Sequence, residues 1–255
     1  MMKSKSVIIA LCSLAVLVSV PVSAQDAPAV NQVVTVKVKP GANAGVEEYV
    51  AAVREVSQQL DLENYWLASQ SVSGPAIYTF VLNRDGWSGL ADPGPQPRFA
   101  EVLGEREAER LTNLFTNAVE SVSTAFYVTR PALSVPPNDL EGTPDAVVYY
   151  NLTIHEGMMP QYVQTAIATR EAAQAVAPDL RYIVQTPSFG ATGVRLVAII
   201  NSWSDLSSNL GPGQMTVQHY GDTLGAALSA AAQETIANIE ISLNRTRPDL
   251  GYQPD

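Results

Sequence analysis

The sequence predicts an α+β protein made of two consecutive β-α-β-β-α-β units whose sheets enclose a common interior. Two observations predict this fold class. Beyond an N-terminal segment with the features of an export signal, the sequence matches itself when shifted by 116 or 117 positions. Within both copies, hydrophobic residues recur in the same order with the period of strands, two residues, and with that of helices, about 3.6 residues.

The N-terminal segment, residues 1–24, reads as a secretory signal peptide. Lys3 and Lys5 precede the apolar run Val7–Val20, and Val22-Ser23-Ala24 supplies a small-residue cleavage site. The apolar run is shorter than the roughly 20 residues that a membrane span needs. We therefore expect this segment to be removed on export, and the Ala-rich, Lys-poor composition predicts a bacterial protein of the periplasm or the medium.

The composition of the remainder excludes several classes of function. The only cysteine, Cys12, lies in the signal segment, so the mature chain has no disulfide, thiolate metal ligand or cysteine nucleophile. Loss of the two signal lysines takes the formal net charge from −10 to −12, which disfavours nucleic acid and anionic membrane as partners. No later segment is apolar enough to span a membrane, so we expect no membrane association after signal cleavage.

The internal repeat is carried by residues that fix turns and packing. At a shift of 116 or 117 positions, glycine, proline, tryptophan and charged residues coincide without a gap larger than one residue. The matching pairs are Gly41 and Gly157, Arg54-Glu55 and Arg170-Glu171, Trp87-Ser88 and Trp203-Ser204, Gly94-Pro95 and Gly211-Pro212, Gly104 and Gly221, and Thr129-Arg130-Pro131 and Thr246-Arg247-Pro248. Because these residue types restrict the backbone, their coincidence predicts a tandem duplication.

The first half of each unit reads as a strand, a helix and two further strands. In the first unit Val33–Lys39 alternates as a strand, and the next segment has apolar residues at helical spacing. That apolar face consists of Val46, Tyr49, Val50, Val53 and Leu60. Tyr65–Ser71 and Ile77–Asn83 then read as two short strands, because the turn signal Ser73-Gly74-Pro75 separates them.

The second half of the unit reads as a loop, a helix and a last strand. Asp92–Pro97 is rich in glycine and proline, which predicts a loop. The following helix is predicted from an apolar face made of Leu103, Leu111, Leu114, Phe115, Ala118 and Val122. The last strand, Thr124–Arg130, ends because Pro131 cannot donate to a sheet.

The order β-α-β-β-α-β is that of a ferredoxin-like unit, a four-stranded sheet with both helices on one face. The other face of such a sheet must be covered. We therefore expect a first unit at 31–135, a linker at 136–144 and a second unit at 145–251, with the two sheets facing each other in an intramolecular pseudo-dimeric α+β barrel. The chain would then be a monomer that acts as a pseudo-dimer.

The chain resembles the dimeric α+β barrel superfamily, which includes the antibiotic biosynthesis monooxygenases, other cofactor-independent oxygenases and haem-degrading enzymes. The resemblance covers nearly all of residues 31–251 and rests on the element order, the tandem units, and a tryptophan that closes the third strand of each unit, Trp87 and Trp203. It implies the fold. It implies no single activity, because this fold carries many unrelated functions.

The candidate ligand-binding residues are polar residues of the first strand of each unit. Period two separates the apolar residues that face the helices from a polar set that faces the space between the sheets, namely Thr35, Lys37 and Lys39 in the first unit and Asn151, Thr153 and His155 in the second. The two lysines are the only ones in the mature chain. They predict an anion-binding or polar cavity for a small organic molecule, or else a solvated strand end.

Two histidines are the candidate catalytic residues. His155 and His219 are the only histidines, and they are the side chains expected to titrate near neutral pH. The resemblance to haem-degrading members implies an asparagine on the first strand, a tryptophan and a histidine on the second helix. Asn151 and His219 match two of these, but no tryptophan occurs in Ser204–Gly221. Metal ligation by His155-Glu156 and His219-x-x-Asp222 is chemically acceptable, yet no spacing demands it, and we expect neither metal nor cofactor.

Residues that both units share are predicted to have a structural role, and a single functional site is predicted at positions that differ between the units. The paired Arg54-Glu55 and Arg170-Glu171, and the repeated Thr-Arg-Pro, are expected to tie a helix to a strand end in each unit. The leading hypothesis is an exported protein that binds a small molecule between its sheets. The alternatives are a cofactor-independent oxygenase or related small-molecule enzyme that uses His155 or His219 as a base, and a structural or interaction module whose barrel is packed with side chains.

Overall fold

Eight antiparallel strands and five helices make up the protein, as seen in a computed structural model that describes residues 30–63, 65–84, 86–91, 94–136, 142–189, 193–207 and 211–254. The predicted signal segment and most of the predicted linker lie outside these described residues. The fold is therefore a mixed α+β fold built on an antiparallel sheet, as the sequence predicts.

Each half of the chain contributes four strands in the order β-α-β-β-α-β. The first half contains β1 (Val30–Val38), β2 (Trp66–Ser71), β3 (Ile77–Arg84) and β4 (Val119–Thr129). The second half contains β5 (Ala146–Ile154), β6 (Arg181–Pro187), β7 (Gly193–Ile200) and β8 (Ile236–Thr246). The strands are 6 to 11 residues long, and all but β2 carry several of the β-branched residues that suit a pleated surface.

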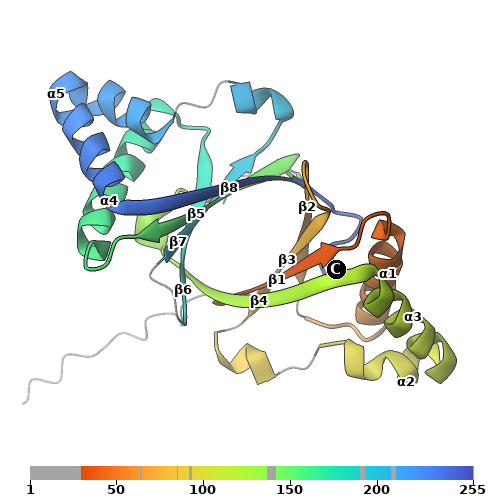
Figure 1. Cartoon of the computed structure of the whole chain (residues 1–255). Helices are drawn as coiled ribbons and strands as arrows, with labels where there is room; N and C mark the ends of the chain where they lie inside the picture. The colour runs from red at the N-terminus through yellow and green to blue at the C-terminus, as the bar shows by residue number, and fades with distance from the viewer. Residues whose placement is uncertain are drawn as a thin grey trace, which may run out of the picture.

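The eight strands close into one barrel in the order β1-β3-β2-β8-β5-β7-β6-β4 (Figure 1). Within each half the strands pair along most of their length, but the halves join at two short junctions. At one junction β2 pairs with β8 from Ser69↔Thr246 to Ser71↔Asn244, and at the other β4 pairs with β6 from Tyr127↔Pro187 to Thr129↔Gln185. The barrel interior is thus bounded by both halves.

The helices lie on the outside of the barrel, on opposite sides (Figure 1). The first half carries α1 (Asn43–Gln59), α2 (Phe99–Leu103) and α3 (Glu105–Ala118), and the second carries α4 (Met159–Val176) and α5 (Pro212–Glu234). Short 3₁₀ turns occupy Ser88–Ala91, Gln96–Arg98, Pro131–Leu133 and Trp203–Ser207. Each set of helices packs on its own sheet over a separate hydrophobic core.

The alternation predicted for the first strand decides which side chains meet the helices. Val34, Val36 and Val38 pack in the core under α1 and α3, whereas Asn31 lines the interior of the barrel. In the second half Leu152 and Ile154 likewise belong to the helix-side core. The odd-numbered residues of β1 and β5 therefore point to the interior.

The second helix of the first half is shorter than predicted and is interrupted. Gly104 separates α2 from α3 because its φ of 84° and ψ of 151° lie outside the helical region, in a conformation that only glycine adopts readily. The helix then ends at Ala118, so Val122 belongs to β4 and not to the helix face. Gly221 interrupts α5 in the same way, with φ 82° and ψ 168°.

The repeated Thr-Arg-Pro segment is the point where each half crosses onto the other. Beyond β8, the Arg247 backbone N–H donates to Ala68 O of β2, and Tyr252 and Trp66 exchange two backbone hydrogen bonds of 3.0 Å. Beyond β4, the Arg130 N–H donates to Val184 O of β6, and Val135 and Tyr182 exchange two of 2.9 Å. We call these two crossings the clasps.

The paired arginines of α1 and α4 hold the clasps in place. Arg54 of α1 donates from Nη1 to the Asp249 carbonyl at 2.9 Å, and Arg170 of α4 donates to the Ala132 carbonyl at 3.1 Å. The predicted contact between a helix and the end of a strand is therefore present in both halves. It links the two halves, however, and it consists of a hydrogen bond to a backbone carbonyl.

The clasp around Arg247 is the more polar of the two. Arg247 Nη1 donates to Glu47 Oε1 at 2.7 Å and to Gln70 Oε1 at 2.9 Å, and its other nitrogens contact Asp249. Tyr78 also donates to Glu47 at 2.7 Å. Burial and this hydrogen bond to a carboxylate raise the pKa of Tyr78 to about 12.

We predict that Glu47→Gln reduces the pH dependence of stability in acid. The hydrogen bond from Arg247 holds the pKa of Glu47 below its ordinary value of 4.5 in the folded protein. The Glu47 carboxylate is therefore protonated at a higher pH in the unfolded chain than in the folded protein. Its contribution to the free energy of unfolding is complete above about pH 4.5 and is lost as the pH falls through the lowered folded-state pKa. Urea unfolding of both proteins between about pH 3 and pH 6 measures the difference.

The substitution should flatten that profile without abolishing its slope, because Arg247 also lowers the pKa of Asp249. Glu63→Gln, at an exposed position, is the control and should leave the slope unchanged. An identical slope for Glu47→Gln and wild type would contradict a role for this ion pair in stability.

Candidate functional site

A cavity of about 850 Å³ lies between the two sheets and extends to one end of the barrel. Its walls come from all eight strands, and its mouth is formed by Pro136, Thr143 and Pro144 near the predicted linker and by Pro248, Gly251 and Gln253 near the C-terminus. The size falls in the range of roughly 300 to 1,000 Å³ that small-molecule sites have. Because both halves line it, the cavity exists only when the barrel is closed.

The barrel interior has an apolar half and a polar half. Toward the mouth, the inward-facing residues of the second sheet are Val147, Ile183, Val197 and Ile199. Toward the other end they are Asn151 and Thr153 of β5 and, opposite them in register, Glu240 and Asn238 of β8, all four of which are exposed. A molecule in this interior would therefore meet apolar walls on one side and hydrated polar groups on the other.

Arg195 of β7 lies at the boundary between these two halves. Its side chain points into the cavity, and the residue is only 6% exposed. The guanidinium carbon lies 4.1 Å from the ring centroid of Tyr149 and 5.2 Å from that of Tyr127. Among the described residues, none forms a hydrogen bond with its Nε or an ion pair with its guanidinium. A cation at this depth normally has an anionic partner.

Other polar groups, some of them buried, line the interior near Arg195. Gln185 of β6 and Asn151 of β5 flank it in register. Ser69 Oγ lies 3.1 Å from the Tyr149 hydroxyl and accepts from Asn244 Nδ2 at 3.4 Å, whereas Asn244 Oδ1 has no partner among the described residues. On the first sheet, Asn31 donates to Thr129 Oγ1 at 3.0 Å.

The lysines predicted to bind a ligand lie away from this cavity. Lys37 forms an ion pair with Glu120 of β4 at 2.6 Å, and Lys39 donates to the Asn117 carbonyl at 2.9 Å. Thr35 shares the inward face with Lys37 but does not line the cavity. Their proposed role in ligand binding stays a prediction, for the polar end of the barrel.

The predicted residues of the second half divide between the interior and the surface. Asn151 and Thr153 face the polar half of the interior, and Asn151 pairs in register with Arg195. His155 follows β5, is exposed, and uses its backbone N–H to bond Thr235 O. His219 is exposed on α5 beside Tyr220, at 4.4 Å between ring centroids. The histidines are therefore not brought together with Arg195, and their catalytic role stays a prediction.

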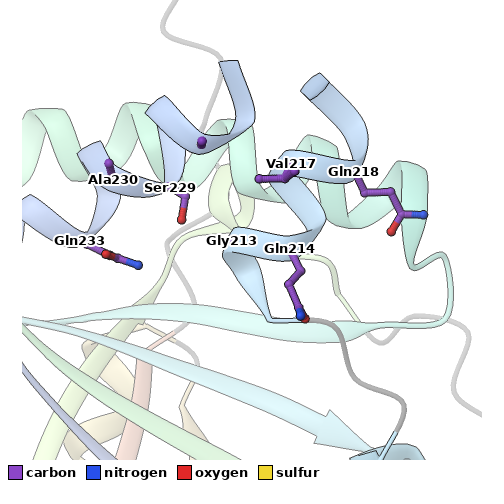
Figure 2. A pocket seen from close by; sticks show the side chains of 8 residues that line it. Gly213, Gln214, Val217, Gln218, Ser229, Ala230 and Gln233 are labelled. Atoms are coloured by element: carbon purple, nitrogen blue, oxygen red, sulfur yellow. The ribbon is translucent and has the colours of Figure 1, made fainter. Parts of the chain in front are cut away.

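A second, shallower groove lies between the two arms of α5 (Figure 2). One arm contributes Gly213, Gln214, Val217 and Gln218, and the other Ala226, Ser229, Ala230 and Gln233. His219 is adjacent in sequence but does not line the groove. The small residues here let the two arms pack closely, since a Cβ on Gly213 would lie 2.6 Å from Ser229 Oγ.

Two further findings limit what the described residues can hold. They contain no group of three or more His, Cys, Asp or Glu side chains placed to bind a metal ion. In the same part of the chain, no helix has both the length and the apolar character of a membrane span.

The sequence analysis missed Arg195, although a signal for it was present. At a shift of 116 positions Arg195 stands opposite Thr79, so it is a charged residue found in only one of the two copies. It also lies at an inward position of an alternating strand, between the buried Val194 and the half-buried Leu196.

Comparison with known proteins gives a fold and no family. No protein-family model and no curated protein matches the sequence. Solved structures do match. A candidate monooxygenase from Fusobacterium nucleatum superposes with a TM-score of 0.57 at 8% identity, covering 86% of this chain and 93% of that chain.

Two further structures resemble the chain to a similar degree. An anthrone oxidase-like protein matches with a TM-score of 0.52 at 12% identity over 86% of this chain and 92% of its own. The chlorite dismutase from Candidatus Nitrospira defluvii matches with a TM-score of 0.51 at 10% identity over 87% and 92%. These neighbours belong to the dimeric α+β barrel superfamily, so the resemblance predicted from the sequence is confirmed at the level of the fold.

We predict that Arg195→Met stabilises the ligand-free protein, whereas Arg247→Met destabilises it. Removing the guanidinium relieves a desolvation cost of several kcal/mol, which we expect to exceed the roughly 2 kcal/mol or more of the lost cation–π contacts. Removing Arg247 takes one donor from each of Glu47 and Gln70, which keep those from Tyr78 and Arg245, and should cost roughly 1–3 kcal/mol. Urea unfolding at neutral pH gives both free energies, and equal losses in the two variants would show that Arg195 is a structural residue.

Proposed function

We propose that this protein binds a small organic molecule in the cavity between its two sheets. The observation that carries the proposal is the cavity itself, about 850 Å³ in volume, with apolar walls and a few polar groups directed into it. The likeness to solved structures supports the fold that encloses such a space. Each of those structures is under 25% identical, so the ligand must be inferred from this chain's own residues.

We further propose that the chain is a tandem pseudo-dimer with one asymmetric site. The paired Arg54 and Arg170 and the two clasps support a shared ancestry of the halves, because equivalent residues make equivalent contacts. The interior departs from that symmetry at Arg195 and Thr79. A single functional site in a duplicated fold is expected to diverge in this way. Export to the periplasm or the medium, inferred from residues 1–24, is part of the same proposal.

An enzymatic role is the second candidate, and the neighbours favour it. Their names are those of monooxygenases, an anthrone oxidase-like protein and chlorite dismutase. A cofactor-independent oxygenase or a related enzyme would use His155 or His219 as its base, at a surface site or after a movement toward the substrate, because both are exposed and outside the cavity lining. A structural module with a packed barrel is the third candidate, and the open interior weighs against it.

Native and denaturing mass spectrometry of residues 25–255, purified from the periplasm of the native host, tests the proposal. A defined mass that is present in the folded protein and absent after denaturation is the expected result. Its chemical identity would then decide whether oxidation or simple binding should be assayed.

We predict that Val197→Trp abolishes this bound mass. Val197 lines the apolar half of the cavity, and an indole there would occupy the space that the ligand needs. Val122→Trp is the control, because Val122 is 51% exposed on β4 and does not line the cavity. Circular dichroism should show both variants folded, although overpacking at position 197 is expected to cost about 1–3 kcal/mol. A bound mass that survives in Val197→Trp would place the ligand elsewhere.

A further inference from the structure

The described residues supply no counter-ion for Arg195. The residue is 6% exposed, its Nε has no hydrogen-bond partner, and no described carboxylate lies within ion-pair distance. Arginine stays protonated at all physiological pH values, so the cost of burying this charge cannot be avoided by loss of a proton. A buried group of this kind is normally balanced by an anion, and none of the described residues provides one.

The absence of acidic residues from the cavity is selective. The protein has 25 acidic and 15 basic residues. Even so, the described residues that line the cavity include two arginines, Arg54 and Arg195, and no aspartate or glutamate. Glu240 also faces inward and pairs in register with Asn151, which is the neighbour of Arg195 on β5. Glu240 is exposed, however, and forms no ion pair with Arg195. The described lining of the cavity therefore carries positive charge, although the protein as a whole is acidic.

The two tyrosines orient the guanidinium without using its donors. Arg195 lies over the ring of Tyr149 at 4.1 Å and near that of Tyr127 at 5.2 Å. A cation over an aromatic face is held through the π-system, so its N–H groups stay available. Those N–H groups form a planar fork that matches the two oxygens of a carboxylate, sulfonate or phosphate.

The position of Arg195 also orients the rest of the ligand. Along β7 the next inward residues toward the mouth are Val197 and Ile199, and on β6 Ile183 continues the same apolar wall. In the other direction lie Asn151 and Thr153, which are exposed to water. A molecule with one charged end and an apolar body fits this division with the charged end at Arg195, since Arg54, the other arginine of the lining, donates to the Asp249 carbonyl.

We propose that the ligand of this cavity is an organic anion, with its carboxylate, sulfonate or phosphate group on Arg195 and its apolar body among Val147, Val197 and Ile199. This inference rests on the proposed ligand-binding function and specifies the chemistry of the ligand. Arg195 is the residue that selects it.

Two fluorescent probes that differ in one charged group test the inference. 8-Anilinonaphthalene-1-sulfonate carries a sulfonate, and N-phenyl-1-naphthylamine has the same aromatic framework without it. Titration of the mature protein should show the sulfonate probe binding about tenfold to 100-fold more tightly, because a charged pair of hydrogen bonds is worth that much in affinity. Arg195→Met and Arg195→Gln should each remove this preference and leave the affinity for the neutral probe unchanged.

Arg106→Met is the matched control. It removes the same charge from an exposed site on α3, so the sulfonate probe should bind as in wild type. Retained binding of the neutral probe shows that the Arg195 variants are folded. Val197→Trp should reduce the binding of both probes if they occupy the cavity.

The outcomes separate the two proposals. Equal affinity for both probes, or a sulfonate preference that survives both Arg195 variants, would overturn the anionic ligand and leave the binding cavity standing. No binding of either probe, together with no bound mass in the native protein, would overturn both. A preference that disappears only in the Arg195 variants supports the inference.

Discussion

Closure of the barrel at two short junctions is the constraint on which the rest of the structure depends. Each four-stranded sheet has a helix-covered face and a bare face, and the bare faces can be shielded from water only by each other. The pairing of β2 with β8 and of β4 with β6 brings them together, and the clasps beyond Thr129 and Thr246 extend that pairing by further backbone hydrogen bonds. Without closure there would be no interior and no ligand cavity.

The same closure explains why the interior is not filled. An eight-stranded barrel is just wide enough to hold side chains or one small ligand. Here the inward positions of the second sheet near the mouth carry medium-sized aliphatic residues, and those at the other end carry polar ones. The buried Arg195 lies in the space left between them, and no described residue forms an ion pair with it. The closure that completes the fold therefore also creates the cavity into which Arg195 points.

Sequence reasoning succeeded where a residue's role depends on local spacing. The alternation of β1 placed Val34, Val36 and Val38 under the helices, and the repeat identified Arg54 and Arg170 as structural residues. It failed at Gly104 and Val122, because apolar spacing alone extended a helix across a glycine with positive φ and into a strand. The ligand-binding role of Lys37 stays a prediction; its ion pair with Glu120, 83 positions along the chain, could not be predicted from local spacing.

The sequence by itself determined the order of the elements, the inward and outward faces of the first strands, and the fold class, because these follow from periodicity and from residues that restrict the backbone. Only the tertiary structure decided which strands join the two halves, that Arg54 and Arg170 reach across to the opposite half, and that Arg195 is buried without a counter-ion. These features depend on contacts between residues far apart in the chain, and no local pattern records such contacts.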